Sequence, residues 1–94
     1  MKAHLKLVKN ALAKDLSVSV FDSEEWQVKR STSYKAIKNA IESVDISQLR
    51  LRDKSGEIVG WALIVLDNED DCTVSDFTYN KLMHDLTGFT WDGE

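Results

Sequence analysis

The segment Leu49–Leu66, LRLRDKSGEIVGWALIVL, predicts a β-hairpin and decides the fold class. Its first part alternates leucine with arginine, which is typical of a strand that buries one face. The polar stretch 53–56 ends in Gly56, which can adopt the positive φ that such a turn needs. The return strand, residues 57–66, is apolar on both faces. We therefore expect this strand to lie inside a sheet and not at its edge.

Outside the hairpin, the chain predicts two more strands and three helices. Alternation over residues 16–20 and 26–29 indicates the strands, with Trp26 and Val28 on one side. Helical spacing of apolar residues indicates helices over 2–14 and 34–44, and a last helix that begins after its expected N-cap Ser75 and ends at Gly88. The run Ser31, Thr32 and Ser33 offers N-cap oxygens just before the second helix. The order α-β-β-α-β-β-α predicts an α+β fold, an antiparallel sheet of about four strands with helices mainly on one face.

Length and composition predict one small domain of a cytoplasmic protein. A chain of 94 residues holds a single core, so residues 1–94 form one domain, with 88–94 as a candidate flexible tail. The longest apolar run has nine residues, whereas a membrane span needs about 20. Cys72 is the single cysteine, and lysines interrupt the N-terminal apolar residues, so we expect neither a disulfide nor a secretory signal.

The net charge of −4 divides unevenly along the chain. Residues 1–54 carry a charge of +4, whereas residues 55–94 carry a charge of −8. Such a division predicts two differently charged surfaces that steer partners, unless the two halves neutralise each other in the folded domain.

The sequence contains no pattern that predicts an enzyme, a cofactor site or a metal site. His4 and His84 fall in predicted helices without a nucleophile motif beside them, so we expect surface or half-buried histidines. The acids between 67 and 71 lack the spacing of a calcium loop, and the four glycines never cluster into a phosphate cradle. We therefore expect a non-enzymatic protein without a cofactor.

The surplus of apolar side chains on the return strand predicts a protein interface. Trp61, Leu63 and Val65 share one strand face, and we expect them to anchor a partner protein or a second copy. The alternative is that the first helix or the C-terminal segment folds over this face. The expected electrostatic rim of the interface consists of four acids, Asp67, Glu69, Asp70 and Asp71.

Nucleic-acid binding is the alternative function. Lys29, Arg50 and Arg52 fall on the outward face of predicted strands, where cations beside aromatic rings can hold phosphates and stack bases. The isoelectric point near 5.1 and the lack of an RNA-recognition motif make nucleic acid the less favoured partner.

The stretch from Val18 to Trp61 resembles small accessory proteins of tailed bacteriophages and prophages. The similarity lies in the segments FDSEEW (21–26), KRSTSYKAI (29–37) and VGW (59–61), and it contains no catalytic motif. The resemblance implies a phage or prophage protein that binds a host protein in the bacterial cytoplasm and modulates or blocks it by steric occlusion. It implies no catalytic residues.

Overall fold

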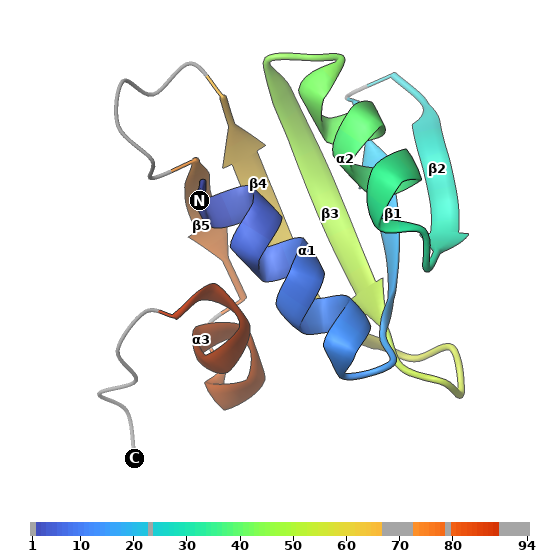
Figure 1. The fold of residues 1–94 in the computed structure, drawn as a ribbon, viewed down its shortest axis with the longest axis vertical. Helices are drawn as coiled ribbons and strands as arrows, with labels where there is room; N and C mark the ends of the chain where they lie inside the picture. Colours follow the sequence, from blue (N-terminus) through green and yellow to red (C-terminus); the bar gives the residue numbers. More distant parts are fainter. Residues whose placement is uncertain (1, 23, 67–72, 79, 89–94) are drawn as a thin grey trace.

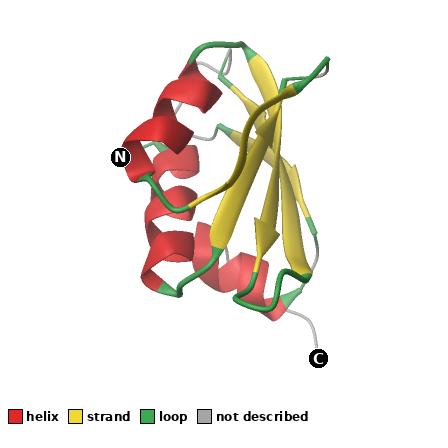
Figure 2. Ribbon diagram, turned by 90° about the vertical axis from the view of Figure 1, so that its right-hand side faces the viewer, coloured by secondary structure: helices red, strands yellow, loops and turns green. Residues whose placement is uncertain are grey.

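Five antiparallel strands form one open sheet in the computed structural model, which describes residues 2–22, 24–66, 73–78 and 80–88. The strand order is β2-β1-β3-β4-β5, and the helices lie together on one face of the sheet (Figures 1 and 2). The predicted α+β class and the antiparallel sheet are confirmed. The elements are α1 (Ala3–Ala13), β1 (Ser17–Phe21), β2 (Trp26–Ser31), α2 (Tyr34–Glu42), β3 (Ile46–Arg52), β4 (Ile58–Val65), β5 (Val74–Phe77) and α3 (Lys81–Thr87).

The core lies between the sheet and the helices. Alternate strand residues point into this layer, and Leu49, Leu51 and Ile64 are all fully buried. The helices contribute Leu7, Val8, Ala11, Ile37, Ile41, Met83 and Leu86, each with no exposed surface. Burying an aliphatic side chain of this size stabilises a fold by roughly 1.5–3 kcal/mol, so this one layer carries most of the apolar stabilisation. Among the described residues, no helix is long and apolar enough to span a membrane.

Local signals for the ends of two elements are confirmed. The Ser33 hydroxyl accepts a hydrogen bond from the backbone N–H of Ala36 at 3.3 Å, which caps α2 as the serine and threonine run predicted. Gly88 ends α3 in the left-handed region at φ 80°, and Gly56 adopts φ 88° in the hairpin turn. These positions need few distant contacts, which is why the sequence predicts them well.

The prediction of about four strands misses β5. Ser75, the expected N-cap of the last helix, lies instead in this strand, where Phe77 pairs with Ala62 and Val74 pairs with Ile64. The last helix begins later, at Lys81, and the Asn80 side chain caps it. The order is therefore α-β-β-α-β-β-β-α. Without β5, the outer backbone groups of β4 would have no strand partner, and pairing them outweighs a local capping preference.

Two register irregularities change which side chains share a face. Between β3 and β4, Arg52 pairs with Ile58 but Leu51 pairs with Gly60. The bulge places Ile58 beside Arg52, away from the helices, and packs Val59 against the core, whereas strict alternation along the return strand predicts Val59 on the side of Trp61 and Ile58 on the side of Ala62.

A second irregularity lies between β1 and β2. Trp26 pairs with Phe21, whereas Val28 pairs with Val20 of the core, so the prediction that Trp26 and Val28 share one side is wrong. Because a bulge depends on pairing with the partner strand, it produces no periodic pattern of residues in the sequence that could predict it.

Gly60 allows α3 to lie directly on β4. A Cβ at residue 60 would overlap the Sδ of Met83 and lie 2.9 Å from its Cγ. Since the Met83 side chain is fully buried, it has little room to move away. The close approach of strand and helix therefore depends on the missing side chain.

We expect Gly60→Ala to lower the free energy of unfolding by about 1–3 kcal/mol, because the added methyl group overpacks the core. Urea unfolding of the variant measures this cost. The same substitution in a Met83→Ala background, where the overlapping atoms are gone, should cost less. Equal costs in the two backgrounds would show that the Met83 contact is not the cause.

Candidate functional site

The face of the sheet opposite the helices is the candidate site, and we call it the open face. No described helix or loop covers it (Figure 2). Pairing places residues from all five strands there in register, such as Arg50 opposite Trp61 and Gln48 opposite Leu63. The open face comprises Ser17, Ser19, Phe21, Trp26, Ile46, Gln48, Arg50, Arg52, Ile58, Trp61, Leu63, Val65 and Asp76.

One end of the open face is an apolar patch, which consists of Ile46, Trp61, Leu63 and Val65. The three anchors predicted from sequence lie together on β4 and are half-buried. Ile46 pairs with Val65 and is 51% exposed. The Trp61 indole donates a hydrogen bond to the Gln48 side chain at 3.3 Å, which holds the ring across β3. Sequence reasoning missed Ile46, although it stands two and four residues before Gln48 and Arg50, at the spacing of one strand face.

The other end of the open face holds a cationic hollow of about 200 Å³, lined by Ser19, Trp26, Lys29, Arg30 and Arg52. Of the three cations predicted to bind nucleic acid, two line this hollow. The third, Arg50, pairs with Ser19 on the neighbouring strand. The structure therefore brings both predicted sets of residues, apolar and basic, onto one face. Sequence reasoning did not predict Trp26 and Arg30 as residues of this hollow, because their positions depend on the bulge in β2.

The cations of the open face lack anionic partners among the described residues. Four cations form no ion pair with any residue that the structure describes: Lys29, Arg30, Arg50 and Arg52. One Arg52 Nη donates to the backbone oxygen of Gly56 at 2.8 Å. The Arg52 Nε and one Arg50 Nη are buried without a hydrogen-bond partner in the same part of the chain. Buried donors of this kind are uncommon and call for an explanation.

The predicted acidic rim lies outside the described residues. Asp67, Glu69, Asp70 and Asp71 all fall in the segment 67–72, so their proposed role stays a prediction. On the described part of the open face, the charged side chains beside the predicted anchors are mainly basic.

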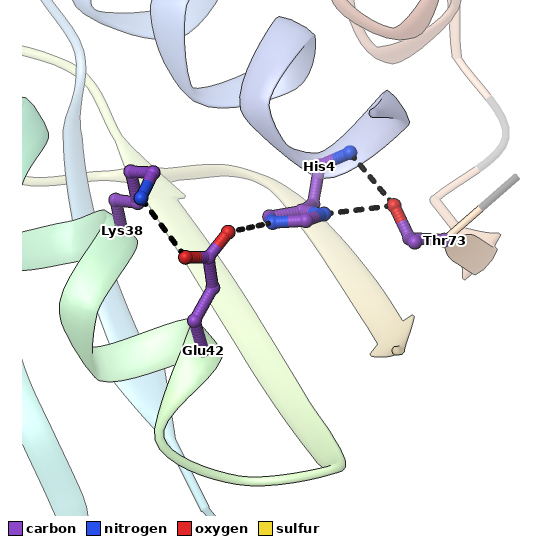
Figure 3. Close-up of polar contacts among 4 residues, drawn as sticks. All are labelled: His4, Lys38, Glu42 and Thr73. Carbon is purple, nitrogen blue, oxygen red and sulfur yellow. Dashed lines mark hydrogen bonds and ion pairs between the residues drawn. The ribbon is translucent and has the colours of Figure 1, made fainter. Parts of the chain in front are cut away.

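A separate polar cluster joins α1, α2 and the start of β5 (Figure 3). The His4 ring lies 2.8 Å from the Thr73 hydroxyl through Nδ1 and 3.0 Å from the Glu42 carboxylate through Nε2. The Thr73 oxygen also accepts the backbone N–H of His4 at 3.0 Å. With the ring proton on Nε2, every one of these groups has a partner.

The cluster resembles a hydroxyl–imidazole–carboxylate relay, but its burial argues for a structural role. His4 and Thr73 have no exposed surface, so a substrate has no access to the hydroxyl. The prediction of a surface or half-buried histidine is wrong for His4, and His84 is also buried, edge-on against Phe77. The described residues contain no group of three potential metal ligands.

Lys38 completes the cluster on its solvent side. Its ammonium lies 3.0 Å from the Glu42 carboxylate, one helical turn away. Hydrogen bonding to Lys38, and then to His4, lowers the pKa of Glu42 below its ordinary value of 4.5, although partial burial opposes the shift. The carboxylate form of Glu42 is therefore favoured in the folded protein.

No protein-family model matches this chain, and neither a curated protein nor a solved structure matches it.

We expect Thr73→Val to lower the free energy of unfolding by about 1–3 kcal/mol, because it leaves the buried Nδ1 of His4 without its donor and the His4 backbone N–H without its acceptor. Thermal or urea unfolding measures this loss. Thr32→Val, at an exposed position where the hydroxyl makes no hydrogen bond with the described residues, is the matched control. A loss no larger than that of the control would contradict a structural role for the cluster.

The pKa of Glu42 also predicts a pH dependence. A lowered folded-state pKa stabilises the protein above about pH 4.5, and this contribution disappears as the pH falls through the folded-state pKa. Lys38→Met should raise the pKa of Glu42, as measured by NMR titration of its carboxyl carbon, and should start acid unfolding at a higher pH. An unchanged titration midpoint would show that Lys38 does not set this pKa.

Proposed function

We propose that this chain is a small non-enzymatic binding protein that docks a partner protein on the apolar patch of its open face. The observation that carries the proposal is that β4 is apolar on both sides, while the helices cover only one. Contiguous exposed apolar surface on a small protein typically marks an interaction site. Trp61, Leu63 and Val65 are the anchors, and Ile46 extends them onto β3.

The chemistry of the open face favours a different protein over a second copy. Four cations, at residues 29, 30, 50 and 52, lie on the same face as the apolar patch, and Asp76 is an acid of that face. A symmetric dimer through this face would bring both sets of cations into one interface, where like charges repel. The partner that fits has an apolar centre and carboxylates placed to meet Arg50.

The resemblance to phage and prophage accessory proteins supplies the context of the proposal. In that setting, the partner is a host protein of the bacterial cytoplasm, and the effect of docking is steric occlusion or recruitment. The acids Asp67, Glu69, Asp70 and Asp71, which lie outside the described residues, would steer the encounter, as the sequence predicts.

Nucleic-acid binding is the second candidate function. The observation that favours it is the cationic hollow, where Lys29 and Arg52 lie beside Trp26 without an anion among the lining residues. The local charge of this end of the face is thus opposite to the net charge of the chain.

The test of docking is capture from nuclease-treated bacterial lysate with immobilised variants, followed by binding measurements on the purified captured protein. Trp61→Ala should weaken that complex by about 2 kcal/mol or more if the indole is a central anchor. Ile46→Lys, at a position that is 51% exposed, should also abolish capture, because it places a charge in the patch.

Trp26→Ala is the matched control, since it removes the same side chain from the other end of the open face. Circular dichroism checks that each variant is folded. A captured protein that binds all variants equally, or that is lost only with Trp26→Ala, would overturn docking on the apolar patch.

A further inference from the structure

The cationic hollow concentrates positive charge without an internal counter-charge. Three of its five lining residues are cations, Lys29, Arg30 and Arg52, and none is acidic. A second hollow of about 440 Å³ lies on the other side of Arg30, but its basic residues are matched by Asp15 and Asp53. Of these two hollows, the one on the open face has the excess of positive charge, which makes it the better suited to an anion.

Backbone contacts hold two of these cations in place before any ligand arrives. Arg30 adopts a left-handed backbone at φ 49°, and its N–H donates to the Ser19 hydroxyl at 2.8 Å. Arg52 is tied to the hairpin turn through Gly56. A non-glycine residue in the left-handed region is strained, and such strain persists where the surroundings require that backbone. The bulge in β2 thus places Lys29 and Arg30 at the hollow that Arg52 also lines.

An aromatic ring forms one wall of the same hollow. Trp26 is 38% exposed, and its indole lies 5.0 Å from the Phe21 ring, centroid to centroid, at a tilt of 54°. Phe21 supports one side of the indole, which leaves ring surface facing the hollow. Indole surface beside several cations is the combination that binds a nucleotide, because the cations hold the phosphate and the ring stacks on the base.

The same chemistry continues across the sheet. Beyond the hollow, Arg50 follows on β3 and Trp61 faces it on β4. The distance from β2 to β4 spans three strand spacings, roughly 14 Å, which is longer than one nucleotide needs. A fourth cation, Arg50, and a second indole, Trp61, thus lie along one path that starts at Trp26.

We infer that the open face binds single-stranded nucleic acid, with one phosphate in the cationic hollow, its base against Trp26, and the strand running on toward Arg50 and Trp61. The inference rests on the second candidate function and names its site. The aromatic wall favours this ligand over a phosphorylated or acidic peptide, since the cations alone would serve those. The unpartnered donors of Arg50 and Arg52 are consistent with groups that lack their anion.

The test is fluorescence anisotropy of a labelled oligothymidylate of about ten nucleotides, at low salt, with the full chain. The expected result is binding that weakens steeply as salt rises. Lys29→Ala/Arg52→Ala should reduce affinity about tenfold or more and should lower the slope of log affinity against log salt by about 0.7 for each lost phosphate contact. Trp26→Leu should also reduce affinity about tenfold, with little change in the salt slope, because it removes stacking and not charge.

Lys14→Ala/Lys35→Ala is the matched control, because Lys14 at the C-cap of α1 and Lys35 on α2 are both exposed, and the double variant removes the same charge. This variant should bind as the wild type does. Circular dichroism must show that all variants are folded, and Lys29→Ala alone serves if the loss of the Arg52–Gly56 bond prevents folding.

Four results would overturn the inference: no binding by the wild type at low salt, an equal loss in the control, binding unaffected by Trp26→Leu, or equal competition by a phosphoserine peptide. Thymidine monophosphate that binds as tightly as the oligonucleotide would overturn the path across β3 and β4. Docking of a partner protein is tested separately, by capture with the Ile46→Lys variant in the absence of nucleic acid. Either proposal can therefore fail without the other.

Discussion

The rest of the structure depends on an imbalance at strand β4, which is apolar on both faces although the three helices cover only one. On the covered side, Ala62 and Ile64 are fully buried beneath the helices. On the other side, Trp61 and Leu63 are half-buried by their neighbours on the sheet alone. Three short helices are enough to form one core layer, and a two-layer domain leaves the second sheet face available for binding.

The polar network around His4 and the bulges have different roles in this arrangement. The hydrogen bonds from His4 join the N-terminal helix to Thr73, just before the edge strand and 69 positions along the chain, and to Glu42 at the end of α2, and so hold the covered side together. The bulges act on the other side. One turns Ile58 out beside Arg52, and the other aims Lys29 into the hollow that Arg52 lines. The open face thus acquires an apolar end and a basic end.

Sequence reasoning succeeded where the signal was local or periodic. The hairpin around Gly56, the Ser33 cap and the left-handed Gly88 were all predicted from neighbouring residues. The shared face of Trp61, Leu63 and Val65 followed from the period of a strand. It failed at β5, because the Ser75 region has acceptable helix-capping chemistry, and only the unpaired edge of β4 makes a strand the better choice.

The sequence by itself determined the α+β class, the antiparallel hairpin and the two-sided apolar character of β4. Only the tertiary structure decided which face the helices cover, that His4 is buried, and that Trp26 and Arg30 meet Arg52 in one hollow. The physical reason is that periodicity and capping arise within a few residues. Strand register, bulges and helix placement arise instead from packing and hydrogen bonds between segments far apart in the chain, which no local pattern encodes.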